Sequence, residues 1–243
     1  MIVVIPARYA SSRLPGKPLA DIHGKPLVQY VYDCASASSA NKVVIATDDQ
    51  RIIDAAESFG ANVVMTRTDH SSGTDRIAEV VELLQLPDDE IIINVQGDEP
   101  MMPAALIDQV ARTLSSHSKA GMSTAMHALD SVEDMNDPNI VKVVSDKDGY
   151  AIYFSRAPIP YPRDQAGKAF IGAYRHIGIY GYRAAFIKQY AAWPACDLEQ
   201  IERLEQLRVL WNGERIAVCD ACELPGPGVD TADDLQRVIE LMK

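Results

Sequence analysis

The sequence predicts an α/β protein with a mostly parallel central sheet and a smaller antiparallel insertion. Short apolar segments alternate with amphipathic segments through the first half of the chain, which is typical of an open sheet covered on both faces. After residue 120 the pattern changes to paired extended segments. The chain has 243 residues, of which 47% are hydrophobic, so it can bury one large core. We therefore expect a single domain over residues 1–243.

The parallel part is expected to begin with a buried strand over residues 1–5. This apolar run meets Pro6, which has no N–H to donate to a neighbouring strand. Further strands are predicted at 42–46, 62–65 and 90–96. Residues 26–36 have helical spacing, and residues 49–59 end at Gly60, a common residue just after a helix. Right-handed crossovers of this length predict a Rossmann-like sheet that binds ligands at the carboxyl ends of its strands.

Antiparallel structure is expected over approximately residues 120–180. An Asp148-Gly149 turn separates residues 140–145 from 150–155 and favours a hairpin. A proline-rich loop then leads into aromatic, extended residues at 170–183. We expect this region to form an inserted antiparallel subdomain, with a mobile loop at 157–169.

Two helices are predicted towards the C-terminus. Asp197, with Gln200 three residues later, resembles a capping box, and leucines keep helical spacing up to Gly213. Thr231 and Asp234 have the same spacing at the start of the last helix. Asp230 therefore lies directly before a helix N-terminus.

Composition argues against several classes of function. A net charge of −11 and a pI near 4.9 disfavour nucleic-acid binding, because no basic stripe is present to replace counterions. No segment resembles a signal peptide or a membrane span, so we expect a cytoplasmic protein that does not bind membranes. Cys219 and Cys222 form a CxxC motif, but without a second CxxC or a His pair the spacing favours neither zinc nor redox chemistry.

The loop after the first strand carries a cluster of cations. Arg8, Arg13 and Lys17 follow Ala7 in a segment rich in Gly, Pro and Ser, where backbone amides and side chains can converge on a polyphosphate. This is not a Walker A loop, because Pro18 stands where Ser or Thr would bind magnesium. Any metal must therefore be held elsewhere. The alternative is a basic surface loop.

Asp98 is the strongest candidate metal ligand in the sequence. It follows the apolar strand at 90–96, so its carboxylate should project from the sheet edge into a cleft. Magnesium needs only one or two carboxylates, because phosphate and water oxygens complete its octahedron. Asp230 is the natural second ligand. The alternatives are a simple turn at Asp98 and a neighbour of a helix cap at Asp230.

Eight sequence strings occur in an order that resembles the sugar-acid cytidylyltransferases, especially those acting on 3-deoxy-manno-octulosonate (KDO). They are IPARYASSRLPGKPLADIHGKPL at 5–27, ATDD at 46–49, SGTDR at 72–76, NVQGDEP at 94–100, FSR at 154–156, HIGIYGYR at 176–183, LEQLRVLW at 204–211 and GVDTADDL at 228–235. The resemblance covers nearly the whole chain. It implies a GT-A-like nucleotidyltransferase fold, magnesium held by Asp98 and Asp230, and a homodimer formed largely through the antiparallel insertion.

The resemblance also implies a reaction. The anomeric hydroxyl of KDO would attack the α-phosphorus of CTP and release pyrophosphate, as a step in the synthesis of lipopolysaccharide precursors. Arg8, Arg13, Lys17 and Asp98 are the expected catalytic residues: Arg13 and Lys17 on the β- and γ-phosphates, and Arg8 near the α-phosphate. The alternative for the cations is that they only steer the substrate.

Further nucleotide contacts are expected at two helix starts. Ser72 and Gly73 with the following amides form a polar nest that can bind a base or ribose, and Arg76 projects towards the same edge. Asp48 or its neighbour can meet the cytosine or ribose. In the structural alternative these aspartates cap a helix, and Thr74 is the cap of the helix that begins nearby.

The acceptor carries a carboxylate and several hydroxyls, so it requires a forked cation and polar partners. Arg156 and Gln96 meet these demands, followed by His176, Tyr180 and Glu202. A packing histidine and a solvated helix glutamate are the alternatives for His176 and Glu202.

Two rivals to KDO transfer remain at this point. The acceptor can instead be an 8-amino derivative of KDO or a nine-carbon sialic acid. A GT-A-like glycosyltransferase or a non-catalytic nucleotide-binding module is the rival from another class. The combination of Arg13, Lys17, Asp98 and Asp230 argues against a non-catalytic module, and the lack of an obvious DxD motif counts against a glycosyltransferase.

Overall fold

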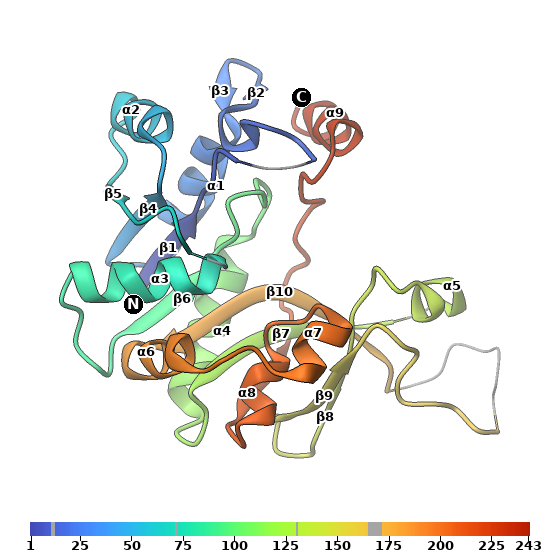
Figure 1. The fold of residues 1–243 in the computed structure, drawn as a ribbon. Coiled ribbons are helices and arrows are strands. Elements are labelled where there is room, and N and C mark those ends of the chain that lie inside the picture. The colour runs from blue at the N-terminus through green and yellow to red at the C-terminus, as the bar shows by residue number, and fades with distance from the viewer. Residues whose placement is uncertain (11–12, 71, 130, 165–171) are drawn as a thin grey trace.

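The computed structural model describes residues 1–10, 13–70, 72–129, 131–164 and 172–243, and it confirms the mixed α/β class (Figure 1). The strands of the main sheet lie in the order β11, β7, β10, β6, β1, β4, β5. Only β10 among these seven described strands runs against the others. Their bounds are β1 (Ile2–Pro6), β4 (Lys42–Thr47), β5 (Val63–Met65), β6 (Ile91–Asn94), β7 (Met122–Ala128), β10 (Tyr174–Arg183) and β11 (Ile216–Asp220).

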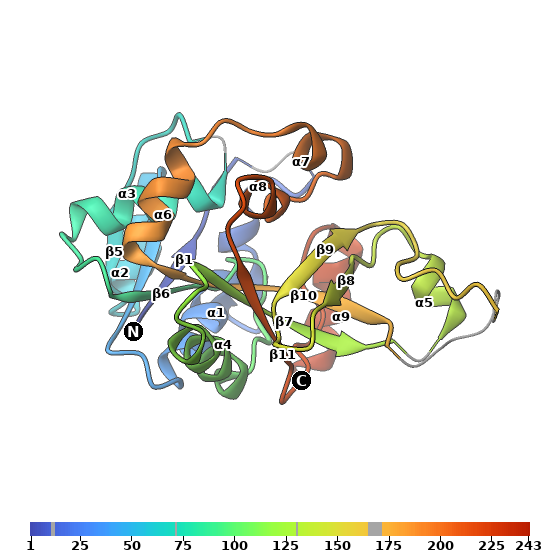
Figure 2. The same cartoon turned by 90° about the horizontal axis from the view of Figure 1, so that it is seen from below.

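Helices cover both faces of the sheet, as Figure 2 shows. One face carries α1 (Leu27–Ser36), α2 (Gln50–Ser58), α4 (Ala104–Ser116) and α9 (Ala232–Leu241), and the other carries α3 (Gly73–Leu83), α6 (Ala184–Ala192) and α8 (Leu207–Trp211). Val3 and Ile5 of β1 join the first core, whereas Ile2 and Val4 join the second, because successive side chains of a strand alternate between faces. No helix in the described part of the chain is long and apolar enough to cross a bilayer.

The N-terminal and C-terminal segments meet beside the carboxyl ends of the parallel strands. The loop after β1 leads into a 3₁₀ turn, η1 (Lys17–Leu19), and a short hairpin, β2 (Asp21–Ile22) and β3 (Lys25–Pro26). His23 Nε2 lies 2.8 Å from the backbone oxygen of Ile239 in α9. Figure 1 shows α9 next to this hairpin. The cation loop and the segment that ends in α9 are therefore held close together.

Among the described strands of the main sheet, antiparallel ladders involve β10 and the hairpin attached to it. The hairpin strands β8 (Lys142–Ser145) and β9 (Ala151–Ser155) pair with each other, β8 also pairs with β10, and α5 (Val132–Asn136) precedes them. Gly149 has φ 79°, as the predicted turn requires. β10 continues into the main sheet between β6 and β7. The division into a domain and an inserted dimer-forming subdomain stays a prediction. Residues 165–171, which include the end of the predicted mobile loop at 157–169, lie outside the described residues.

The prediction of one continuous helix after residue 197 is wrong. α7 (Asp197–Glu202) ends at Arg203, which has the left-handed φ of 55°, and α8 begins only at Leu207. The N-cap of α7 is Cys196, one residue before the predicted Asp197. The backbone N–H of Cys196 donates to Glu199 Oε2 at 3.3 Å. Glu199 forms a buried ion pair with Arg208, with Arg208 Nε 2.7 Å from Oε2 and Nη2 2.5 Å from Oε1. This pair joins the two helices across the break.

Candidate active site

The predicted cations and carboxylates meet at the carboxyl ends of β1 and β6. Lys17 Nζ lies 2.7 Å from Asp98 Oδ2 and 3.3 Å from Asp230 Oδ1, while Arg13 Nη2 lies 2.8 Å from the same oxygen of Asp230. The Lys17 side chain is only 13% exposed, so its ammonium is largely enclosed by these carboxylates. Residues separated by more than 200 positions in the sequence thus form one charged cluster.

Local structure explains why three distant segments present these groups together. Lys17 begins η1 after Gly16, whose φ of 71° turns the loop back towards the sheet. Asp98 follows β6. Asp230 directly precedes Thr231, the N-cap of α9, which forms the predicted capping box with Asp234. The backbone N–H of Val229 donates to Asp98 O at 2.9 Å and fixes the last segment against the turn after β6.

Gly97 permits a close backbone approach beside Asp98. A Cβ atom at position 97 would lie 2.6 Å from the carbonyl oxygen of Pro6 at the end of β1. The two strand ends can therefore be this close only if position 97 has no side chain.

We expect Gly97→Ala to lower the free energy of unfolding by about 1–3 kcal/mol, the usual cost of overpacking. The shift of backbone needed to relieve the contact also moves Asp98, so activity should fall at least tenfold. Urea denaturation and pyrophosphate release measure the two effects. Gly178→Ala is the matched control, because a Cβ there meets no atom within 4 Å. Equal unfolding curves for Gly97→Ala and the wild type would contradict the prediction.

Glu99 adds a third carboxyl group to the cluster. Burial, followed by the negative charges of Asp98 and Asp230, raises the pKa of Glu99 to about 7. The three carboxyl groups thus outnumber Lys17 and Arg13, the two cations that pair with Asp98 and Asp230. A site with this excess of negative charge is suited to a divalent cation.

The raised pKa of Glu99 predicts a pH dependence of stability without ligands. The folded protein retains a proton on Glu99 that the unfolded chain releases, so stability should decrease as the pH rises from about 4.5 to about 7. Each unit of pKa difference corresponds to about 1.4 kcal/mol. Thermal unfolding measured across this range without metal should show the decrease, and Glu99→Gln should reduce it. A wild type and a Glu99→Gln variant with parallel profiles would contradict this assignment.

The predicted nucleotide nest lies at the start of α3. Ser72 is the N-cap, and its hydroxyl accepts from Asp75 N at 3.1 Å while Asp75 Oδ2 accepts from Ser72 N at 3.0 Å. The prediction that Thr74 caps this helix is wrong, because a capping box already satisfies the helix start. Thr74 Oγ1 instead donates to Glu205 Oε2 at 2.9 Å. Gly73 is the first residue of α3, and a Cβ there would lie 3.4 Å from Cγ of Pro6 at the end of β1.

Arg76 is buried and contacts Asp48 at the end of β4. Arg76 Nη2 donates to Asp48 Oδ2 at 2.8 Å, Nη1 contacts the hydroxyl of Thr66, and the Arg76 side chain is 0% exposed. Its influence on the predicted nucleotide site therefore passes through Asp48. The neighbouring Asp49 is the N-cap of α2, with Oδ1 3.0 Å from Arg51 N.

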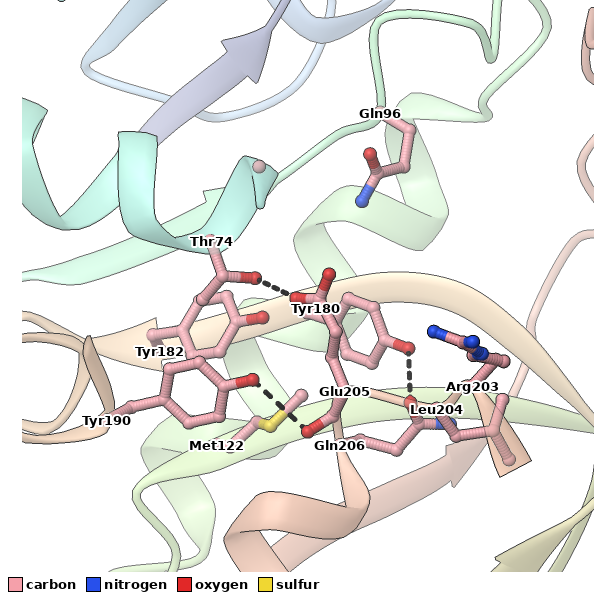
Figure 3. Close-up of a pocket in the computed structure, with 11 residues that line it drawn as sticks. Thr74, Gln96, Met122, Tyr180, Tyr182, Tyr190, Arg203, Leu204, Glu205 and Gln206 are labelled. Carbon is pink, nitrogen blue, oxygen red and sulfur yellow. Dashed lines mark hydrogen bonds between the residues drawn. The ribbon is translucent and has the colours of Figure 1, made fainter. Parts of the chain in front are cut away.

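Two adjoining cavities share Gly73 and Gln96. The first has a volume of about 340 Å³ and is lined by the cation loop and the turn after β6, namely Pro6, Ala7, Arg8, Ala10, Arg13, Lys17, Pro18, Gly73, Gln96, Gly97 and Asp98. The second, drawn in Figure 3, has a volume of about 230 Å³ and is rich in tyrosine. Its lining consists of Gly73, Thr74, Gln96, Met122, Tyr180, Tyr182, Tyr190, Arg203, Leu204, Glu205 and Gln206.

The second cavity presents polar groups on an aromatic wall. Tyr180 donates to Gln206 Oε1 at 3.3 Å, and Tyr190 donates to Glu205 O at 3.1 Å. Gln206 Nε2 is buried and has no partner within the part of the chain that the structure describes. Figure 3 shows Gln96 across the cavity with its amide directed towards the tyrosines. An unpaired buried donor is costly, so this cavity is suited to a ligand that carries hydroxyl or carboxylate oxygens.

A β-bulge shapes this wall. The pairing of β10 with β7 shifts register between Ile177 and Tyr180. The hydroxyl of Thr124 lies 3.1 Å from Ile177 O and 2.7 Å from Ile179 O and so fills the gap in the ladder. Bulges of this kind change the direction in which the following side chains point. Tyr180 and Tyr182, which follow the bulge, both line the cavity.

The remaining predicted acceptor residues lie outside the lining of both cavities. Arg156 Nε donates to Glu202 O at 2.7 Å, and Arg156 N donates to Glu202 Oε2 at 3.0 Å. His176 lies 2.9 Å from Thr124 Oγ1, and its ring packs near Tyr180 with 5.4 Å between centroids. Burial lowers the pKa of His176 to about 3, so the ring is neutral. Gln96 and Tyr180 line the cavity, whereas Arg156, His176 and Glu202 are not among its lining residues.

Sequence reasoning missed Glu205 and Gln206 as cavity residues. Both lie within a leucine spacing that predicts a continuous helix. The helix in fact ends at Arg203, and after this break Glu205 and Gln206 line the cavity together with Tyr180. Cys219 and Cys222 are both free, and Cys219 Sγ lies 3.7 Å from Thr124 O.

The carboxylates of Asp98 and Asp230 fit a magnesium ion. Both already converge on one cation, Lys17 Nζ, and magnesium prefers one or two carboxylates with water and phosphate oxygens. Within the described ranges, no group of three or more His, Cys, Asp or Glu side chains is arranged to hold a metal ion by itself. The donor set therefore suits a metal that arrives with a phosphate ligand.

Comparison with known proteins identifies the family of this chain. The family model described as Cytidylyltransferase matches residues 2–216. The chain belongs to the cytidylyltransferase family. A protein of Histophilus somni (strain 129Pt), named 3-deoxy-manno-octulosonate cytidylyltransferase, is 54% identical over 250 residues, which cover 99% of this chain and 97% of the relative. A protein of the same name from Pseudomonas syringae pv. syringae (strain B728a) is 56% identical over 247 residues, with the same coverage of both chains.

Solved structures agree with this membership of the cytidylyltransferase family. A CMP:2-keto-3-deoxy-manno-octonic acid synthetase complexed with CTP has a TM-score of 0.91 and 43% identity, over 99% of this chain and 97% of that one. A cytidylyltransferase from Leptospira borgpetersenii has a TM-score of 0.64 at 12% identity, and that likeness concerns the fold alone. The resemblance inferred from the sequence strings is confirmed.

Proposed function

We propose that this cytidylyltransferase transfers CMP from CTP to the anomeric hydroxyl of KDO and releases pyrophosphate. Relatives that bear the name of this activity are 54% to 56% identical over nearly their whole length. The observation that carries the proposal is the pair of adjoining cavities. One is lined by phosphate-binding cations and the other by polar aromatic groups, and Gln96 lies at their junction.

The phosphate side of the reaction is assigned to the cation loop. Arg13 and Lys17 bind the β- and γ-phosphates and stabilise the charge that develops on the leaving pyrophosphate, while Arg8 binds near the α-phosphate. Asp98 and Asp230 would hold Mg²⁺, which neutralises phosphate charge and lowers the pKa of the attacking hydroxyl. The sugar oxygen forms a bond to the α-phosphorus, and the bond from that phosphorus to the bridging oxygen of pyrophosphate breaks.

The nucleoside side is assigned to the ends of β1 and β4 and the start of α3. The amides after Ser72, beginning with that of Gly73, bind the ribose or base next to Ala7, which lines the same cavity as Gly73. Asp48, which is held by the buried Arg76, is assigned to the same side, where it can accept a hydrogen bond from the cytosine amino group or a ribose hydroxyl.

The acceptor is assigned to the tyrosine-rich cavity. Gln96, Tyr180 and the unpaired amide of Gln206 supply hydrogen bonds to the sugar. We also assign Arg156, Glu202 and His176 to the acceptor site. Arg156 and Glu202 are hydrogen-bonded to each other, and His176 packs against Tyr180.

We also propose a cytoplasmic homodimer that makes a precursor of lipopolysaccharide. Large apolar side chains are exposed on and next to the antiparallel hairpin, which suits an interface between two copies. Among the described residues they include Ile152 at 59%, Tyr161 at 73%, Ile201 at 76% and Trp211 at 56% exposure.

Pyrophosphate release from the purified protein with CTP and magnesium tests the reaction. KDO, its 8-amino derivative and sialic acid should be compared as acceptors. Release that requires KDO supports the proposal. Equal or faster release with another acceptor would contradict KDO as the preferred acceptor. If CTP binds but none of the three acceptors gives release, the proposed reaction is overturned.

A further inference from the structure

Tyr9 occupies a central place in the cation loop. It directly follows Arg8, and its carbonyl oxygen accepts from Gly16 N at 3.0 Å, which closes the loop just before Lys17. Its ring also packs against Gly16, since a Cβ there would lie 3.2 Å from the ring atom Cζ and from the hydroxyl oxygen. The start and the end of the cation loop are therefore joined at Tyr9.

Arg51 of α2 lies over the ring of Tyr9. Its guanidinium carbon is 3.3 Å from the ring centroid, a short cation–π contact. Asp49 fixes the orientation of this guanidinium, with Arg51 Nε 2.8 Å from Oδ1 and Nη2 2.6 Å from Oδ2. Asp49 is itself fixed as the N-cap of α2. The planar cation is thus held in place before any ligand binds.

The contact links the cation loop to the rigid part of the fold. α2 packs on the sheet through Ile52 and also contacts η1. Lys17 has its own anchors in Asp98 and Asp230, whereas the Arg13 side chain is 63% exposed. Tyr9, by contrast, ties the start of the loop both to Gly16 at its end and to Arg51 of α2.

We propose that Arg51 and Tyr9 form a positioning pair that holds the cation loop in the geometry required by the triphosphate of CTP. The inference rests on the proposed function, because it assigns Arg8, Arg13 and Lys17 to the phosphates. Neither member of the pair needs to touch the substrate. Without the pair, ordering of the loop has to accompany ligand binding, and the cost of that ordering lowers affinity.

Loss of the pair is expected to weaken binding of the triphosphate CTP more than binding of the monophosphate CMP. CTP meets the whole loop through its β- and γ-phosphates, whereas CMP has neither of them. Arg51→Ala should therefore weaken CTP binding about three- to tenfold and leave CMP binding within twofold of the wild type. Arg51→Lys keeps the charge but loses the planar fork, so its affinity for CTP should lie between those of Arg51→Ala and the wild type. Tyr9→Phe, which keeps the ring, should resemble the wild type.

Calorimetric titration of CTP and CMP in the presence of magnesium measures this difference. Arg67→Ala is the matched control. Arg67 is 66% exposed against 58% for Arg51, and it likewise pairs with an aspartate two residues away, with Nε 3.2 Å from Asp69 Oδ1. A loss of CTP affinity in Arg51→Ala that exceeds the loss in Arg67→Ala supports the pair. Equal losses in these two variants, or an equal loss of CMP affinity in Arg51→Ala, would overturn it.

Hydrogen exchange in the ligand-free protein provides a readout that does not depend on the proposed function. Peptides that contain Tyr9 and Gly16 should exchange faster in Arg51→Ala than in the wild type or in Arg67→Ala. Unchanged exchange would overturn the positioning pair. A wild-type protein that fails to bind CTP, but whose loop exchanges faster in Arg51→Ala, would overturn the proposed function and retain the contact as an anchor of the loop.

Discussion

Asp98→Ala is expected to reduce kcat for pyrophosphate release at least a hundredfold, which corresponds to about 3 kcal/mol of transition-state stabilisation. Asp98 is one of two carboxylates that converge on the proposed metal position, and its alanine variant leaves Asp230 alone. A metal held by one carboxylate is bound more weakly and is less well placed between the phosphates. The measurement is the initial rate of pyrophosphate release at saturating CTP and KDO, over a range of magnesium concentrations.

The magnesium dependence separates this role from a purely structural one. Asp98→Glu keeps a carboxylate and should require more magnesium for its half-maximal rate, whereas Asp98→Asn should stay slow at every concentration. Asp54→Ala removes a carboxylate from the exposed side of α2, where Asp54 accepts from Gln50, and serves as the control. An Asp98→Ala variant that retains a tenth or more of the wild-type kcat would contradict the assignment of Asp98 as a metal ligand.

Lys17→Ala is expected to lower kcat about a hundredfold as well. The ammonium of Lys17 is nearly enclosed, and in the proposed reaction it stabilises charge on the leaving pyrophosphate, on the scale of a lost oxyanion-hole donor, about 3 kcal/mol. The substitution also leaves Asp98, Glu99 and Asp230 without their shared cation. The pKa of Glu99 should then rise further, because Lys17 is one of the charges that now lower it.

Steady-state kinetics distinguish a catalytic role of Lys17 from simple steering of the substrate. Loss of a contact that strengthens in the transition state lowers kcat, whereas loss of steering raises KM for CTP and leaves kcat unchanged. Lys25→Ala is the control, since Lys25 forms an exposed pair with Asp33. An unchanged kcat in Lys17→Ala would favour the steering alternative.

The cluster of Lys17, Asp98 and Asp230 could be predicted because each residue lies next to a recognisable boundary. Asp98 follows a continuous apolar strand, and Asp230 precedes a capping box. The carboxyl ends of parallel strands meet at one edge, so short-range signals were sufficient to place these groups together. Such local signals also predicted the ends of several elements. The observed ends of β4, α1 and α2 each differ from the predicted ends by at most one residue.

The acceptor side could not be predicted in the same way, because it depends on tertiary contacts. Arg203 adopts a left-handed conformation that nothing in the leucine spacing indicates, and the buried Glu199–Arg208 pair supports the break. The bulge in β10 depends on the hydroxyl of Thr124, which lies more than 50 positions earlier in the chain. Arg76 has an ordinary place in a helix start, and only the folded protein shows that it is buried against Asp48.

The single reversed strand, β10, gives the two halves of the cleft different mechanical properties. Because β10 enters the sheet from the carboxyl side of β6, its residues Tyr180 and Tyr182 place hydrogen-bonded sheet in the wall of the proposed acceptor cavity. The opposite side of the cleft is a loop fastened at a few points. In the proposed reaction, the sugar would thus meet side chains held by the sheet on one side, and the nucleotide would meet the loop. A change of acceptor is accordingly expected to arise by exchange of individual side chains on this wall, since insertions would break the ladder that supports it.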